Sequence, residues 1–201
     1  MLLAELAKTY RRVFPVYIRQ GLVWERAELA HLRRYLRAVG IGPLTVLDLP
    51  VRDVYGKHWS VTGTRVPGAK TRDEAVYLPG RNLMLLSKAA VFCRLHGIPV
   101  IAVGTLGHNP FPDATPKFFR QFSGISGMKV IAPFRRMTKT QVVRRGWQLP
   151  LHLSFSCIAP RRGRHCGRCN KCAERRRGFR EAGVADNTDY VGGLEFAAQR
   201  L

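Results

Sequence analysis

The stretch CGRCNKC at residues 166–172 repeats cysteine at a spacing of three, and a fourth cysteine, Cys157, precedes it. A Cys-x-x-Cys step with a glycine turn brings two thiolates onto one ion, and Zn²⁺ binds four such ligands in a tetrahedron. We therefore predict a zinc site formed by Cys157, Cys166, Cys169 and Cys172. Because four protein ligands leave no open coordination position, the metal is expected to be structural. Its binding would contribute on the order of 10 kcal/mol to folding.

The alternative for these cysteines is a disulfide or a redox pair. Four cysteines in so short a stretch, in a chain without a signal-peptide pattern, favour a metal site. Basic neighbours such as Arg161, Arg168 and Lys171 would also hold the sulfurs as thiolates. The fifth cysteine, Cys93, lies in an apolar helical stretch and is predicted to be a core residue.

The composition describes a strongly basic chain of 201 residues, long enough for one domain with a sizeable core. No apolar run reaches the length of a membrane span and no signal peptide is recognisable, so the cytoplasm is the expected compartment. The 34 Lys and Arg residues against 13 Asp and Glu residues give a net charge of +21. This charge fits nucleic acid or a small anion such as ATP. The basic residues are spread over several predicted helices, which favours the small anion.

Short apolar runs alternate with helical patterns along the first 150 residues. Strands are predicted at residues 13–18, 44–49, 99–103 and 129–134, and helices at 25–39, 83–96, 117–122 and 138–147. The opening MLLAELAKT reads as the middle of a helix, since no capping residue precedes it. Alternation of helices with near-continuous apolar strands is the pattern of an α/β fold with a doubly wound, mostly parallel sheet.

Long loops follow these strands at residues 18–24, 50–80 and 104–116. Such folds bind ligands at the carboxyl ends of their strands, so we expect the functional site at this edge. The segment 50–80 is predicted to be irregular and to serve that site. Glu25 and Glu28 lie near the same edge and are expected to be surface charges. His58 and His108 lie in pocket-facing loops, but nothing fixes either of them in a site.

Three further motifs accompany the cysteines: VYLPGRN at residues 76–82, NPFPD at 109–113, and FSC at 155–157. Together they resemble the 7-cyano-7-deazaguanine synthase family of PP-loop ATP pyrophosphatases, over about residues 3–185. The resemblance implies a Rossmann-like ATP-pyrophosphatase-type domain at residues 1–150, N-terminally incomplete. A zinc-binding loop and helix would follow at 151–185, and a weakly specified tail at 186–201.

In that family ATP activates the carboxylate of 7-carboxy-7-deazaguanine, ammonia attacks it, and the amide is dehydrated to a nitrile in queuosine biosynthesis. The resemblance implies that Arg81 and Asn82 bind the nucleotide and that Asp113 approaches the substrate. It also implies ATP, Mg²⁺ and structural Zn²⁺ as cofactors. No catalytic residue is assigned. A solvated arginine, a helix cap and a turn residue are the respective alternatives for Arg81, Asn82 and Asp113.

The sequence departs from the family pattern in two places. The family begins with a strand and a Ser-Gly-Gly-x-Asp-Ser loop that cradles pyrophosphate, and this sequence contains no such motif. Loss of a central strand would leave unpaired strand edges, each buried group costing roughly 1–3 kcal/mol. We therefore expect an N-terminal segment of about twenty residues to be missing, which leaves open that the chain is inactive as written. Residues 17–24, YIRQGLVW, replace a histidine-containing substrate motif, so a different carboxylate also remains open.

Two other classes of function remain. The first is a related tRNA-modifying enzyme, with the basic surface as a tRNA footprint, for which Cys93 is a poor catalytic cysteine. The second is a non-enzymatic zinc module that binds nucleic acid. The expected partners are a small carboxylate and ammonia, and the sequence leaves a homodimer open.

Overall fold

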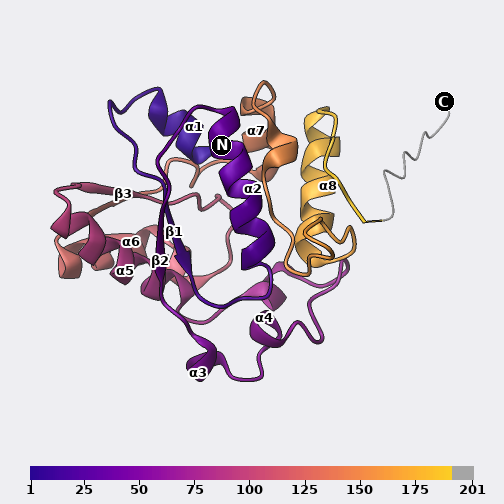
Figure 1. The fold of residues 1–201 in the computed structure, drawn as a ribbon, viewed down its shortest axis with the longest axis horizontal. Helices are drawn as coiled ribbons and strands as arrows, with labels where there is room; N and C mark the ends of the chain where they lie inside the picture. Colours follow the sequence, from indigo (N-terminus) through magenta and orange to yellow (C-terminus); the bar gives the residue numbers. More distant parts are fainter. Residues whose placement is uncertain (192–201) are drawn as a thin grey trace.

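The computed structural model describes residues 1–191, in which helices surround two pairs of short parallel strands (Figure 1). The part of the predicted tail beyond Val191 lies outside the described residues. β1 (Val16–Arg19) pairs with β2 (Thr45–Asp48), and β3 (Val100–Ala102) pairs with β4 (Lys129–Ile131), both in parallel. The predicted α/β class with parallel strands is confirmed.

The two strand pairs are not hydrogen-bonded to each other, so the sheet consists of two separate pieces within residues 1–191. In a parallel ladder the backbone groups of successive residues point to opposite edges. Because the Arg19 carbonyl accepts the Leu49 N–H at 2.7 Å, Arg19 faces β2 and its neighbour Ile18 faces away. Within residues 1–191, β1 and β3 each pair with one strand, so each has one edge that is not hydrogen-bonded to another strand.

An apolar cavity of about 570 Å³ lies between the two strand pairs. Its walls include Val16 and Ile18 of β1, Val100 and Ala102 of β3, and leucines of α1 (Leu2–Ala7). The backbone groups at these two strand edges thus face a space lined mostly by hydrocarbon.

Longer helices cover the strands and build the rest of the molecule. α2 (Glu25–Ala38) follows β1, while α5 (Arg81–Leu95) and α6 (Pro116–Ser126) pack on β3 and β4. α7 (Lys139–Arg145) and α8 (Asn170–Ala182) pack against each other and lie side by side in Figure 1. Capping residues determine where two of these helices begin. Thr115 caps α6 ahead of Pro116, and Thr138 with Gln141 forms a capping box on α7.

The segment 50–80 is less irregular than predicted. It contains α3 (Arg52–Tyr55), α4 (Trp59–Thr62) and a 3₁₀ turn (Asp73–Val76). A helix of four residues is too short to display an apolar period, so the prediction of a purely irregular segment was wrong here. Two further 3₁₀ turns lie at Pro112–Ala114 and Leu151–Leu153.

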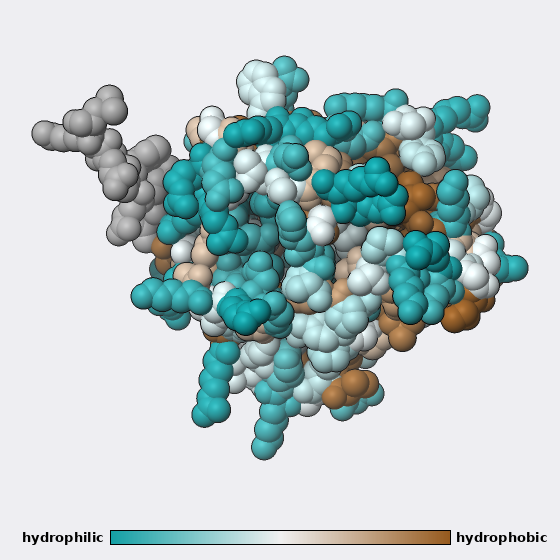
Figure 2. Space-filling view, turned by 180° about the vertical axis from the view of Figure 1, so that it is seen from behind, coloured by the Kyte–Doolittle hydropathy of each residue, from teal (hydrophilic) through white to brown (hydrophobic). Residues whose placement is uncertain are grey.

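Two main apolar clusters form the core. One surrounds the four C-terminal cysteines and includes Leu22, Trp24 and Val51, and the other joins α5, α6 and β3. Cys93 belongs to the second cluster, as predicted, and burial raises the pKa of its thiol. Hydrophilic side chains cover most of the face in Figure 2, with hydrophobic ones gathered mainly near one edge. Among the described residues, none of the helices has the length and apolarity needed to cross a bilayer.

Candidate functional site

The four cysteines of the C-terminal loop converge on one point. The sulfurs of Cys157, Cys166, Cys169 and Cys172 all lie within 4.8 Å of one another, and all four residues are buried. The Cys157–Cys169 and Cys166–Cys172 sulfur pairs are each 3.9 Å apart. A tetrahedral site with metal–sulfur distances of 2.3 Å has sulfur–sulfur edges of about 3.8 Å. The donor set and its spacing therefore fit a metal ion such as zinc.

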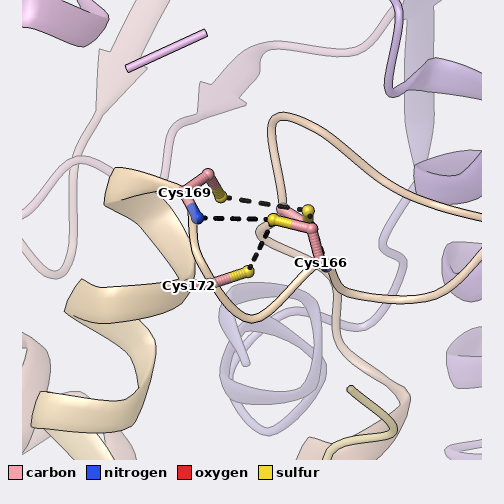
Figure 3. A group of neighbouring side chains, drawn as sticks. Cys166, Cys169 and Cys172 are labelled. Atoms are coloured by element: carbon pink, nitrogen blue, oxygen red, sulfur yellow. Dashed lines mark hydrogen bonds between the residues drawn. The ribbon is translucent and has the colours of Figure 1, made fainter. Parts of the chain in front are cut away.

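The local backbone explains why these sulfurs meet. Gly167 has a φ of +75°, which turns the chain sharply after Cys166, and Cys169 is the N-cap of α8 (Figure 3). Backbone N–H groups donate to the sulfurs: Ala159 and Cys166 to Cys157 Sγ at 3.4 and 3.3 Å, and Cys169 to Cys166 Sγ at 3.3 Å. These donors and the nearby helix N-terminus favour thiolates. Hydrogen bonding among the four sulfurs lowers the pKa of Cys166 and Cys169 and raises the pKa of Cys157 and Cys172.

Hydrogen bonds from the first turn and the middle of α8 hold this helix against the rest of the molecule. At its start, Asn170 donates its backbone N–H to the Pro67 carbonyl at 3.0 Å and its side-chain amide to the Thr71 carbonyl at 2.9 Å. Farther along, the buried Arg175 guanidinium donates to Leu151 O, Ser154 Oγ and Thr188 Oγ1, at 2.8 to 2.9 Å. The cysteine loop and these hydrogen bonds thus hold α8 in place, so that its exposed side can form part of another site.

A polar cavity of about 830 Å³ lies beyond the carboxyl end of β3, at the edge where the sequence predicted a site. It is formed by the start of α5, the loops that follow β3, and the facing sides of α7 and α8. Lys139 of α7 and Lys171 of α8 line it together. Both ammonium groups contact the Glu174 carboxylate, at 3.3 and 2.9 Å. The cysteine loop therefore places a lysine, Lys171, in the wall of this cavity.

The structure brings Arg81, Asn82 and Asp113 together in this cavity. The Asn82 backbone N–H donates to Asp113 Oδ2 at 3.0 Å, and its side-chain amide donates to Asp113 O and Oδ1 at 3.1 and 3.3 Å. Gly80, not Asn82, is the N-cap of α5, so the helix-cap alternative for Asn82 is wrong. Asp113 is buried within a 3₁₀ turn, where its carboxylate holds the start of α5.

Arg81 is half-buried rather than solvated. Its Nε donates to Gln20 Oε1 at 3.0 Å, and its guanidinium lies 5.8 Å from the centre of the Trp24 ring. Gln20 is fully buried. No other side-chain hydrogen bond of Arg81 is formed within residues 1–191, so the remaining donors of the guanidinium are free to bind an anion in the cavity.

Two glutamates were expected on the surface, and that expectation was wrong. The Glu25 carboxylate accepts the backbone N–H groups of Gln20 and Gly21 at 2.6 and 2.8 Å, which closes the loop before α2. One turn later, Glu28 Oε2 accepts the Tyr17 hydroxyl at 2.7 Å. Burial raises the pKa of Glu28 and that of Tyr17. Glu28 lines both the apolar and the polar cavity. Its place on the same helical stripe as the apolar residues of α2 was the signal for burial.

The two histidines left outside the predicted site have different positions. His108 lines the polar cavity, and His58 caps α4 by accepting the Ser60 N–H at 3.3 Å. Burial lowers the pKa of His58. Neither histidine makes a hydrogen bond to Arg81, Asn82 or Asp113.

Comparison with known proteins agrees with this geometry. The family model described as "Queuosine biosynthesis protein QueC" matches residues 1–183. The chain belongs to the QueC family. The predicted resemblance is thereby confirmed, and it extends over both the strand pairs and the cysteine loop.

Curated relatives of this QueC-family chain carry the name 7-cyano-7-deazaguanine synthase. A protein of Anaeromyxobacter dehalogenans is 35% identical over 189 residues, which cover 83% of this chain and 80% of the relative. One of Syntrophobacter fumaroxidans is 32% identical over 212 residues, covering 94% and 88%. One of Leptospira interrogans is 31% identical over 179 residues, covering 80% and 74%. These similarities support a role in queuosine biosynthesis and a ligase-type enzyme.

Proposed function

We propose that this chain is an ATP-dependent carbon–nitrogen ligase that converts 7-carboxy-7-deazaguanine and ammonia to 7-cyano-7-deazaguanine. The observation that supports it most is the polar cavity beyond β3, where Arg81, Asn82 and Asp113 meet in a QueC-family chain. The relatives' name, 7-cyano-7-deazaguanine synthase, supplies the product.

The proposed reaction removes both oxygens of a carboxylate. ATP first converts the carboxylate to a mixed anhydride, and ammonia displaces the phosphate-bearing oxygen to give an amide. The amide oxygen then attacks a second ATP and becomes bonded to a phosphate group. Loss of that oxygen with the phosphate group, together with the two N–H protons of the amide, leaves the nitrile. Each step moves negative charge onto a phosphate group, so cations around the cavity would stabilise it. Mg²⁺ is the proposed metal partner of ATP.

Four cationic side chains line the cavity and could serve this role: Arg81, Lys139, Lys171 and Arg177. A guanidinium presents paired donors that match phosphate or carboxylate oxygens, so we assign Arg81 to nucleotide binding. We propose that Asn82 lies beside the nucleotide at the start of α5. Its hydrogen bond to Asp113 would hold it in that position. Asp113 in turn would border the substrate. The two residues thus position the Arg81 side of the cavity.

We further propose that Cys157, Cys166, Cys169 and Cys172 hold a structural zinc ion. Four buried sulfurs with this spacing would complete the coordination of the ion, which would act on folding rather than on chemistry. Because α8 begins at this cluster, zinc would also keep Lys171 in the cavity wall.

The tRNA-modifying and zinc-module alternatives have less support. Cys93 is buried in the cluster of α5, α6 and β3 and its pKa is raised, so it is unsuited to act as a catalytic thiolate. A zinc module alone leaves the polar cavity and the strand pairs without a role.

The test is a direct assay of residues 1–201 with ATP, Mg²⁺, ammonium and 7-carboxy-7-deazaguanine. We expect ATP consumption that depends on the carboxylate, with the nitrile as product by mass spectrometry. Absence of any carboxylate-dependent consumption would reject the proposal for this chain. A steep salt dependence of tRNA binding would instead favour one of the alternatives.

A further inference from the structure

Glu28 occupies an unusual place in the molecule. It is one of six residues that line both the apolar and the polar cavity, together with Arg81, Asn82, Leu85, Val103 and Thr105. Its carboxylate therefore lies where the polar cavity meets hydrocarbon. The residue is half-buried and burial raises its pKa, so an ionised carboxylate is costly there unless its oxygens accept hydrogen bonds.

The hydrogen bonds of this carboxylate are incomplete. An ionised carboxylate has about four acceptor positions. Within residues 1–191, Glu28 uses one of them, for the Tyr17 hydroxyl on Oε2 at 2.7 Å. Arg81 lies near enough for its charge to lower the pKa of Glu28 against the effect of burial, yet no hydrogen bond joins the two side chains. Acceptor capacity on both oxygens remains for a ligand.

The other acids in or near these cavities that are at least half-buried already have polar partners. Asp113 holds the Asn82 amide and backbone, and Glu25 holds two backbone N–H groups. Glu174 contacts Lys139 and Lys171. Glu28 differs from these acids because its carboxylate accepts one hydrogen bond within residues 1–191, whereas each of the others has two polar partners.

We propose that Glu28 is a specificity-determining residue that binds the donor edge of the heterocyclic substrate. This inference rests on the proposed function for the identity of the heterocycle. A 7-deazaguanine ring carries its N1–H and its exocyclic 2-amino group side by side, and this pair of donors matches the two oxygens of a carboxylate. Tyr17 would fix the orientation of the carboxylate as a positioning residue. The ring then lies against the apolar boundary, and its 7-substituent is free to point toward the cations of the polar cavity.

The test measures binding without catalysis. Titration calorimetry compares 7-cyano-7-deazaguanine with the analogue that lacks the 2-amino group. Wild-type protein is expected to prefer the 2-amino ligand by at least about tenfold, because the analogue leaves a buried acceptor unpaired. Glu28→Gln should reduce this preference to about twofold or less, since its amide keeps only one acceptor oxygen. Tyr17→Phe should give an intermediate ratio, and it serves as the second variant if Glu28→Gln does not fold.

Glu74→Gln is the matched control, because Glu74 is exposed and lies in neither cavity. It should retain the wild-type preference. An unchanged preference in both Glu28→Gln and Tyr17→Phe would overturn the inference, and so would equal affinity of the wild type for the two ligands or binding of neither. A wild type that discriminates between the ligands but never consumes ATP would reject the proposed reaction and retain the role of Glu28.

Discussion

Asn82 donates both its backbone N–H and its side-chain amide to Asp113, so one residue pair joins the start of α5 to the loop that follows β3. The two residues are 31 positions apart in the sequence. The pair fixes the N-terminus of α5 beside the polar cavity, where Arg81 immediately precedes Asn82. The position of Arg81 in the cavity wall therefore depends on the buried Asp113 carboxylate as well as on the loop backbone.

Asp113→Asn should weaken this junction. The variant keeps the shape of the side chain but replaces one acceptor oxygen with an amide donor that faces the donors of Asn82. A lost hydrogen bond with a buried unsatisfied donor costs about 1–3 kcal/mol, so we expect the free energy of unfolding to fall by that amount in urea titrations. Asp53→Asn, at an exposed position of α3, should change it by less than about 0.5 kcal/mol. Equal stability of the two variants would contradict the role of the pair.

Removal of the metal should unfold the C-terminal part of the chain. We expect about one zinc ion per chain by elemental analysis, and a strong chelator should lower the melting temperature because zinc binding supplies folding free energy. Cys166→Ser should lose the metal. Cys93→Ala should keep it, since Cys93 lies in the other apolar cluster. A fully folded protein that contains free thiols and no bound metal would rule out the zinc site.

Glu5 should make stability depend on pH in the acid range. Its carboxylate accepts from Lys8 Nζ at 2.8 Å and Arg145 Nε at 2.6 Å, which joins α1 to α7. Hydrogen bonding from Lys8 and then Arg145 lowers the pKa of Glu5 below its ordinary value of 4.5. A lowered folded-state pKa means that this stabilisation is present above pH 4.5 and is lost as the pH falls through the folded-state value.

Glu5→Gln should therefore reduce stability near neutral pH by up to about 1 kcal/mol and flatten the acid limb of the stability curve. Urea unfolding at a series of pH values measures this. Glu181→Gln, at an exposed position of α8, is the control and should leave the acid limb unchanged. A Glu5→Gln curve parallel to that of the wild type would show that the two ion pairs contribute nothing to stability.

Local patterns in the sequence were sufficient to predict the fold class and the cysteine cluster. Apolar runs predicted the four strands found within residues 1–191, and capping residues such as Thr138 marked helix starts. The spacing of the cysteines predicted their convergence because a Cys-x-x-Cys step constrains neighbouring residues directly. These patterns involve residues that are close together in the chain, so they can be recognised without knowledge of the tertiary fold.

Contacts between distant segments could not be predicted in this way. The helical period of α2 indicates that Glu28 faces inward, but its hydrogen bond to Tyr17 and its proximity to Arg81 of α5 depend on the tertiary fold. The link between Lys139 and Lys171 through Glu174 likewise requires α7 and α8 to be packed together. The four-residue helices of segment 50–80 were missed because they are too short to show a period.

The proposed chemistry is tested most directly by following nitrogen from ammonia into the product. Residues 1–201 are incubated with ATP, Mg²⁺, 7-carboxy-7-deazaguanine and ¹⁵N-labelled ammonium, and the products are resolved by mass spectrometry. We expect 7-cyano-7-deazaguanine with ¹⁵N in its nitrile, formed only when both ATP and the carboxylate are present. Carboxylate-dependent ATP consumption that yields no labelled nitrile, or no ATP consumption at all, would contradict the proposed reaction.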